Sequence, residues 1–397
     1  MLQEEMREEE MRRLVVILLA MTAMLSGCAG TSPRLSAVPE ELFADAAFAA
    51  PSTPVGSAGL FTLTQEMRDY LHSARFQSLL RSRGTERGLV TALYSKTDLQ
   101  LEYESAYTRT AAETFRDRSG NCLSLVIMTA AFAKELGMSV SYRNVDMESW
   151  SRSGDVYMLS GHVNILLGTR SASLLSETRV GDSLLVDFLP SPQNDPNRTH
   201  PLEEEDIVAM FMNNRAAETL VEGRLSDAYW WARAAVAGNP HNAMALNTLG
   251  VIYQRHGDPL MAERVYRAAL AREPENVNTL RNLEPLLAAL GKTAEAQAIA
   301  QQLARLEPAP PFLYFNQGVA AYRKGEYDKA RELFRREVRR DPYNDEFHFW
   351  LGASYLQLGQ LDEARAQLAL AVDNSTQGET RQRYSAKLAR LRQLGMR

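Results

Sequence analysis

The chain has 397 residues, a length that corresponds to two or three domains of ordinary size. Hydrophobic residues make up 45% and charged residues 23% of the chain, as in soluble globular proteins. The formal net charge is −5 and no basic stripe is present, so the composition excludes nucleic acid as an expected partner.

The N-terminal 28 residues have the pattern of a secretion signal. Arg12 and Arg13 precede an apolar run over 14–25, which is too short to span a membrane comfortably. The run ends in the sequence L-S-G-C at 25–28. This motif resembles the lipobox of bacterial lipoproteins, which implies cleavage before Cys28 and acylation of its thiol. The alternative, a buried core helix, explains neither the arginines nor the motif.

The residues on either side of this signal add two expectations. Residues 1–10 are acidic, unlike the start of a signal peptide, so we expect the true start at Met11. Ala29 rather than aspartate follows Cys28, and the resemblance then implies an outer-membrane anchor facing the periplasm. Residues 29–59 are rich in Ala, Ser, Pro and Gly and predict a flexible tether.

The middle region, residues 60–201, is where we expect any chemistry. Apolar spacing predicts helices over 65–83 and 99–116. Cys122 then opens an apolar helix that ends at Gly137, and a helix that is apolar all round is buried. Three strands are expected at 139–145, 163–167 and 184–188; His162 immediately precedes the second, and Asp187 lies in the third.

A cysteine at the start of a buried helix, followed by a histidine and an aspartate on successive strands, resembles the transglutaminase-like superfamily. The local sequences are G-N-C, G-H-V and V-D-F. The resemblance implies an α+β fold, helices then an antiparallel sheet, with papain-type thiol chemistry. Cys122 would be the nucleophile, His162 the base and Asp187 its orienting partner. The helix-start N–H of Cys122 is a natural oxyanion donor, and a second donor cannot be assigned.

The alternative interpretation of Cys122 is an inert thiol in the hydrophobic core. Acylation of Cys28 would leave Cys122 as the only thiol, so no intramolecular disulfide is available. We expect no metal and no cofactor, because a second nearby cysteine and an HExxH motif are both missing. The weaker candidates for site residues are His72, His200, His241, His256, His348, Asp182 and Asp195.

The C-terminal half carries an internal repeat. Prolines at 240, 274, 308 and 342 are 34 residues apart, and glycines at 223, 257, 291, 325 and 359 have the same spacing. This is the tetratricopeptide period, which predicts an all-α solenoid of five units over 202–378 and a capping helix at 379–397. The glycines should end the first helix of each pair. Pro285 lies inside a first helix and should kink it.

The first helix of each repeat lines the concave groove in this repeat family. The positions that the family pattern assigns to a peptide-binding groove are Asn247, Val251, Arg255, Asn278, Arg281, Phe312, Phe315, Tyr322, Arg323 and Phe349. The aromatic members could hold a peptide, or they could pack between units or against the N-terminal domain.

Two functions of different class follow from these observations. The first is a thiol hydrolase or acyltransferase acting on protein or peptide amide bonds, with the repeats recruiting substrate or partner; hydrolysis is favoured over crosslinking. The second is a catalytically silent lipoprotein adaptor that scaffolds an envelope complex. A Pro-rich loop over 191–201 and a helical join without a long linker predict that the two domains pack as one rigid unit.

Overall fold

The computed structural model describes residues 40–95, 98–105, 107–153, 156–168, 183–188, 199–375 and 378–394. Cys28 and the expected signal sequence lie outside these residues, as do Asp182, Asp195 and most of the loop over 191–201. Among the described residues, no helix combines the length and apolar character that crossing a bilayer requires.

The described chain begins with a segment that packs on repeat helices. It contains two short 3₁₀ helices, η1 (Glu40–Leu42) and η2 (Asp45–Ala47). Leu42 and Phe48 are buried, and the Phe48 ring stacks on Tyr229 with centroids 3.9 Å apart. Asp45 accepts hydrogen bonds from the Tyr229 hydroxyl at 2.6 Å and from Arg233 at 2.7 Å. The composition of residues 29–59 predicts a flexible tether. In its described part, residues 40–59, contacts with residues distant in sequence instead hold the segment on the repeat helices.

Residues 60–202 form a mixed region of helices and strands. The helices are α2 (Gln65–His72), α3 (Ala74–Arg83), α4 (Thr85–Tyr94), α5 (Ala111–Asp117) and α6 (Cys122–Glu135). The strands are β1 (Glu102–Tyr103), β2 (Ser119–Gly120), β3 (Ser139–Ser153), β4 (Val156–Gly168), β5 (Leu184–Val186) and β6 (Thr199–Leu202). Strands β3 to β6 form one antiparallel sheet in the order β5-β4-β3-β6.

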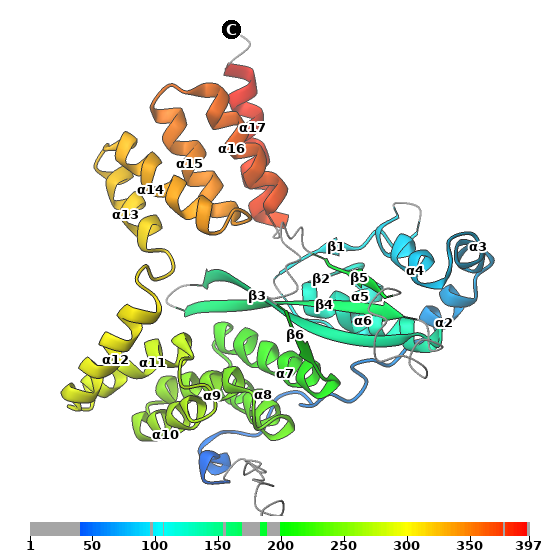
Figure 1. The fold of residues 1–397 in the computed structure, drawn as a ribbon, viewed down its shortest axis with the longest axis horizontal. Coiled ribbons are helices and arrows are strands. Elements are labelled where there is room, and N and C mark those ends of the chain that lie inside the picture. Colours follow the sequence, from blue (N-terminus) through cyan, green and yellow to red (C-terminus); the bar gives the residue numbers. More distant parts are fainter. Residues whose placement is uncertain are drawn as a thin grey trace, which may run out of the picture. The chain divides into compact units, whose positions relative to one another are not determined.

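Helix α6 lies against this sheet, in contact with β3 and β4 and, on its other sides, with α5 and α7 (Figure 1). Every residue from Cys122 to Ala133 is buried, as the apolar character of this stretch predicts. The buried helix fixes the place of its first residue, Cys122, relative to the adjacent strand β4.

Two helix predictions in this region are corrected by the structure. The helix expected over 65–83 is divided at Ser73, whose hydroxyl caps α3 by accepting from the N–H of Phe76. The helix expected over 99–116 is helical only from Ala111, and β1 and a loop precede it. Apolar spacing alone cannot distinguish a buried loop from a helix when the loop side chains are held by tertiary hydrogen bonds.

The C-terminal region consists of five helical pairs and a final helix. The first helices of the pairs are α7 (Glu204–Val221), α9 (Ala243–His256), α11 (Val277–Ala289), α13 (Leu313–Arg323) and α15 (Asp345–Gln357). The second helices are α8 (Leu225–Gly238), α10 (Pro259–Leu270), α12 (Thr293–Leu306), α14 (Tyr327–Arg340) and α16 (Leu361–Asn374), and α17 (Gly378–Leu394) packs on α16. The assigned helix α11 continues through Pro285.

Glycine has two separate uses in these pairs. Gly257 and its equivalents 34 residues apart follow the first helices in the left-handed conformation, with φ of 90° at Gly257, as the repeat pattern predicts. Gly250, inside α9, has a different use: a Cβ there would lie 2.4 Å from a ring carbon of Tyr266 in α10. The missing side chain at Gly250 therefore lets the two helices of the pair approach closely.

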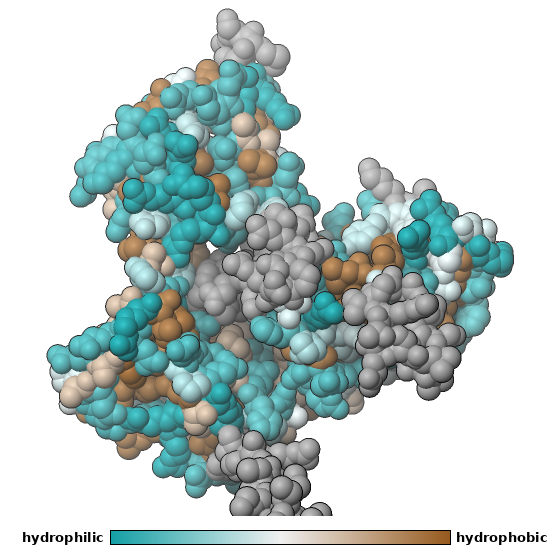
Figure 2. Space-filling model, in the orientation of Figure 1, coloured by the Kyte–Doolittle hydropathy of each residue, from teal (hydrophilic) through white to brown (hydrophobic). Residues whose placement is uncertain are grey.

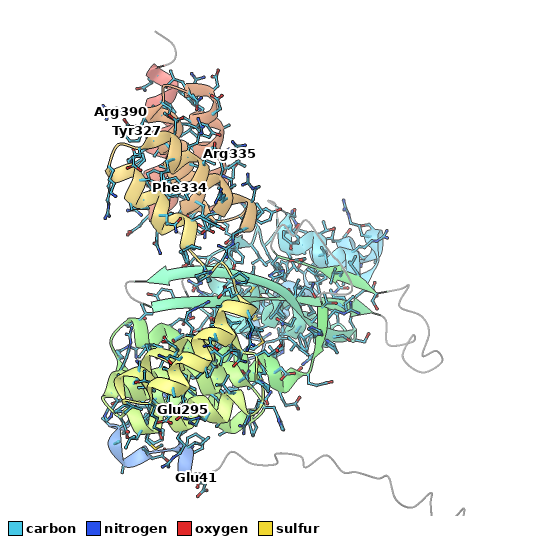
Figure 3. All side chains as sticks on the ribbon, turned by 60° about the vertical axis from the view of Figure 1, so that its left-hand side comes forward. Glu41, Glu295, Tyr327, Phe334, Arg335 and Arg390 are labelled. Carbon is cyan, nitrogen blue, oxygen red and sulfur yellow. The ribbon has the colours of Figure 1, made fainter. Side chains whose placement is uncertain are left out.

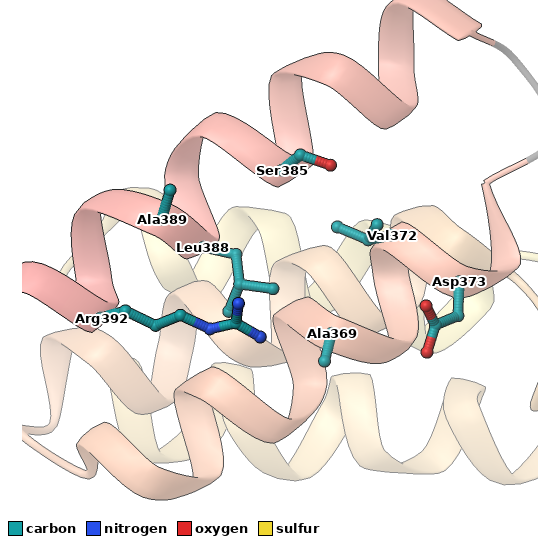
Figure 4. Close-up of a pocket in the computed structure, with 7 residues that line it drawn as sticks. All are labelled: Ala369, Val372, Asp373, Ser385, Leu388, Ala389 and Arg392. Atoms are coloured by element: carbon teal, nitrogen blue, oxygen red, sulfur yellow. The ribbon is translucent and has the colours of Figure 1, made fainter.

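The repeat helices divide their side chains between core and surface. On α14, Phe334 is fully buried while its neighbour Arg335 is half exposed (Figure 3). On the face drawn in Figure 2, the repeat helices show mostly hydrophilic side chains with small, separated apolar patches. A shallow cavity of about 330 Å³ lies between α16 and α17, with Arg392 and Asp373 on opposite sides of Ala369 (Figure 4).

Candidate functional site

Cys122 is the first residue of α6, and Asn121 caps that helix. The side-chain oxygen of Asn121 accepts the N–H of Ser124 at 2.9 Å and the Ser124 hydroxyl at 2.8 Å. Cys122 forms no disulfide with a described residue and is only 7% exposed. The first backbone N–H groups of a helix have no intrahelical acceptor. Cys122 therefore lies beside backbone donors at the start of α6.

His162 and Asp187 are brought together by the pairing of β4 with β5. Ile165 pairs with Val186 in this ladder, and Asp187 follows directly after the strand. Nε2 of His162 lies 2.6 Å from Oδ1 of Asp187, and His162 is only 3% exposed. With a carboxylate as its partner, Nε2 carries the ring proton, which leaves Nδ1 as the nitrogen that can exchange a proton with another group.

The pKa of His162 is shifted by two neighbouring residues, Asp187 and Cys122. Burial alone would lower that pKa, but the hydrogen bond to Asp187, together with the influence of Cys122, raises it from 6.5 to about 9. Cys122 therefore lies near His162, and Nδ1 of His162 is buried without a hydrogen-bond partner among the described residues. The three residues that the sequence pattern singled out, Cys122, His162 and Asp187, meet at one place.

Tyr103 is a fourth member of this cluster, and sequence analysis missed it. Strand β1 pairs in parallel with β2, placing Tyr103 opposite Gly120, and the N–H of Glu104 donates to the Gly120 carbonyl at 3.0 Å. Burial and the charge of the Cys122 thiol raise the pKa of the Tyr103 hydroxyl, while the Cys122 backbone N–H opposes them by hydrogen bonding to it. A two-residue strand has no periodicity, so no sequence signal identified this position.

Tyr94 contacts the backbone of Asp187. Its hydroxyl donates to the carbonyl oxygen of Asp187 at 3.0 Å, and its ring lies near that of Phe188 with centroids 5.9 Å apart. Burial raises the pKa of Tyr94 to about 12, and the charge of Asp187 acts in the same direction, so the hydroxyl remains a donor at neutral pH. This contact fixes the short strand end that carries the carboxylate.

The other histidines lie outside this cluster. His72, His200, His241 and His256 are exposed, and His348 is buried between Gln367 and the Pro342 carbonyl in the last repeat. Asp182 and Asp195, the loop alternatives to Asp187, lie outside the described residues. Among the described residues, no group of three or more His, Cys, Asp or Glu side chains is arranged to hold a metal ion.

The aromatic part of the predicted peptide groove lies in packed layers. Phe312 and Phe315 are 3% and 2% exposed and belong to the core formed by α13, α14 and α15. Tyr322 packs edge-on against Trp350, and Phe349 stacks on Tyr384 of α17 with centroids 4.8 Å apart. The expected groove role is therefore corrected for Phe312 and Phe315, because a side chain buried between helices offers a ligand no surface.

The polar groove positions are distributed differently. Asn247 is buried and accepts a hydrogen bond from Asn282 at 2.9 Å, and Arg281 is paired with Glu307. Val251 and Asn278 are half buried, and Arg255 and Arg323 are exposed. The exposed arginines are the members of the predicted groove most open to a partner.

Comparison with known proteins identifies the repeats. A tetratricopeptide repeat model matches residues 285–345, and a second one matches residues 321–391. The C-terminal region contains tetratricopeptide repeats. Such repeats commonly bind protein or peptide partners, and this region of the chain has the fold for that task. A comparison with curated protein sequences gave no match.

Several similar solved structures are described as tetratricopeptide repeat proteins. A thermophilic TPR protein of Thermus thermophilus is 23% identical, covering 46% of this chain and 99% of its own, with a TM-score of 0.28. PilF of Pseudomonas aeruginosa is 20% identical, covering 48% of this chain and 94% of its own, with a TM-score of 0.27. YrrB, described as a TPR protein with an unusual peptide-binding site, is 20% identical over 46% of this chain and 94% of its own, with a TM-score of 0.25.

Proposed function

We propose that this protein is a thiol hydrolase or acyltransferase that acts on amide bonds of a protein or peptide, with its repeats recruiting the substrate or a partner. The observation that carries the proposal is the buried His162–Asp187 pair, 2.6 Å apart, beside the Cys122 thiol. Support also comes from the sequence resemblance to the transglutaminase-like superfamily. A buried charged pair is costly unless it is used or well compensated, so its place near the Cys122 thiol favours chemistry.

The proposed reaction begins with transfer of the Cys122 proton to Nδ1 of His162. The sulfur attacks the substrate carbonyl carbon, and the carbonyl oxygen takes up negative charge. We assign the stabilisation of this charge to the N–H of Cys122 and the hydroxyl of Tyr103, which interacts with Cys122, so Tyr103 would be the second oxyanion donor that sequence analysis could not assign. The substrate oxygen would replace the hydrogen bond between these two groups.

The tetrahedral intermediate collapses as the C–N bond breaks and His162 returns its proton to the leaving amine. A thioester to Cys122 remains. Water then attacks the thioester to give an acid, or a second amine attacks it to give a new amide. His162 takes a proton from the attacking water or amine and passes it to the sulfur as the C–S bond breaks. Asp187 keeps Nε2 protonated and stabilises the imidazolium in both steps.

The experiment uses the full chain carrying Cys28→Ser, so that Cys122 is the only thiol. Alkylation of Cys122 by iodoacetamide is followed from pH 5 to 9, beside His162→Ala and the control His200→Ala, an exposed residue of the same sheet. We expect reaction well below pH 8, lost in His162→Ala and retained in the control. If Cys122 reacts only at alkaline pH and His162→Ala does not change its rate of alkylation, the proposed enzymatic function is refuted.

A silent adaptor is the second candidate, and the family match of the repeats supports it. In that case the repeats scaffold an envelope complex and Cys122 is an inert core thiol. An unreactive Cys122 in the experiment above would favour this function.

Anchoring at the outer membrane, facing the periplasm, belongs to both candidates and rests on the lipobox-like sequence that ends in Cys28. Incorporation of labelled palmitate that is lost in Cys28→Ser would support it, and unlabelled wild-type protein would refute it. Stable anchoring requires two or more chains on this residue.

A further inference from the structure

Thr108 is the centre of a buried polar network beside the start of α6. Its side-chain oxygen accepts a hydrogen bond from the amide of Asn121 at 2.8 Å and another from the amide of Asn214 at 3.2 Å. Its backbone N–H donates to Oε1 of Glu218 at 2.7 Å. Thr108 is only 2% exposed, so these groups have little access to water as a substitute partner.

The chemistry of the groups fixes the direction of each bond. Glu218 accepts the backbone N–H of Thr108, while the Thr108 hydroxyl oxygen accepts from the amides of Asn121 and Asn214. Since the nitrogen of the Asn121 amide points at Thr108, its oxygen points at Ser124 and caps α6. Glu218 thereby fixes the backbone of Thr108, the Thr108 hydroxyl orients the Asn121 amide, and that amide holds the turn on which Cys122 lies.

Two of these groups come from the first repeat helix. Asn214 and Glu218 are four residues apart on α7 and share one face of it. Arg215 on the same helix pairs with Glu218 at 2.8 Å. At the other end of α7, Glu204 accepts a hydrogen bond from Tyr142 of β3 at 3.1 Å. The helix that begins the repeats therefore contacts the mixed region at two places along its length.

We infer that Asn214 and Glu218 of the first repeat helix are positioning residues for the Cys122 thiol, acting through Thr108 and Asn121. The inference rests on the proposed function, because it assigns these residues to the same reaction. It makes α7 part of the reactive site: a chain that ended before Glu204 would leave the N–H of Thr108 without its buried acceptor.

The test measures the pH profile of Cys122 alkylation in the full chain carrying Cys28→Ser. Three variants each weaken one interaction: Glu218→Gln removes the negative charge from the acceptor of the Thr108 N–H, Asn214→Leu removes one hydrogen bond to the Thr108 hydroxyl, and Thr108→Val keeps the shape but loses the hydroxyl. Thr108→Ser restores the hydroxyl, and Glu222→Gln changes an exposed glutamate of the same helix end. Circular dichroism and the unfolding midpoint of each variant show whether it is folded.

We expect the rate of alkylation at pH 7 to fall by about tenfold to a hundredfold in the three variants, as for a misplacement of reacting groups by about 1 Å. Thr108→Ser and Glu222→Gln should react as the parent chain does. Glu218→Gln, Asn214→Leu and Thr108→Val that stay folded and keep the parent profile would overturn this inference and leave the proposed function standing. A parent chain with an ordinary, His162-independent thiol would overturn the proposed function and this inference with it.

Discussion

Nε2 of His162 lies 2.6 Å from Oδ1 of Asp187, although 25 residues separate the two along the chain. The pairing of β4 with β5 closes that distance, and burial excludes water from the bond. A charge-assisted hydrogen bond in such a place contributes both to the orientation of the imidazole and to the stability of the fold.

Asp187→Asn should destabilise the protein in a pH-dependent way. A histidine whose pKa is raised on folding adds stability that is fully present below 6.5 and is lost as the pH rises through about 9. We expect the variant to lose roughly 1.5–3 kcal/mol near pH 6, the range for a hydrogen bond to a charged group, and less at pH 9. Guanidinium unfolding at pH 6, 7.5 and 9 measures this, with the exposed Asp69→Asn as control. A loss that is the same at every pH would contradict the assignment.

Glu218→Gln should remove a second pH dependence of stability, one that has the same direction as that of His162. Burial raises the pKa of Glu218 from 4.5 to about 7, against the hydrogen bonds of Thr108 and the charge of Arg215. The folded chain then binds a proton that the unfolded chain has lost, so the wild type loses stability as the pH rises from about 4.5 to about 7. Relative to Glu218→Gln, that loss should be roughly 2–4 kcal/mol. Urea unfolding at pH 5 and pH 8 tests it, and Glu222→Gln should show no such trend.

Phe48→Ala should release the N-terminal segment from the repeats. The ring is 7% exposed and stacks on Tyr229 with planes 4° apart, and its loss leaves a cavity at that surface. We expect a cost of roughly 2–4 kcal/mol in the free energy of unfolding and faster proteolysis between Ala49 and Gly59. Leu260→Ala, at a side chain 65% exposed on α10, is the control and should cost little. Unchanged proteolysis in Phe48→Ala would show that this segment is held by other contacts.

Gly250→Ala should destabilise the second repeat. The added methyl would meet the Tyr266 ring at 2.4 Å, so α9 and α10 would have to separate or the ring would have to move. Overpacking of this kind costs roughly 1–3 kcal/mol. Gly378→Ala is a matched control, because a methyl at the start of α17 meets nothing within 4 Å. Thermal unfolding of both variants compares the two positions, and equal midpoints would contradict the close approach.

Several features of this protein follow from short-range rules and could be read from the sequence. The 34-residue spacing of proline and glycine predicts paired helices, because helix ends depend on a few neighbouring residues. The start of α6 at Cys122 is equally local, since Asn121 caps the helix through a residue three positions on. The helix start at Cys122 and the nearby strands were likewise predicted, but His162 lies within β4 rather than before it and Asp187 lies just after β5 rather than in it.

Other features were decided only when distant parts of the chain came together. Thr108 and Glu218 are 110 residues apart along the chain, and Asp45 and Arg233 are 188 apart. The local spacing of residues therefore cannot predict either hydrogen bond. The same holds for Tyr103, whose two-residue strand is defined only by its partner β2. Phe312 and Phe315 had the spacing of groove residues, but the packing of α13 against α14 and α15 buries them. Local sequence determined the helix ends of this protein, while the contents of its reactive site and of its core depend on long-range hydrogen bonds and side-chain packing, which only the tertiary structure specifies.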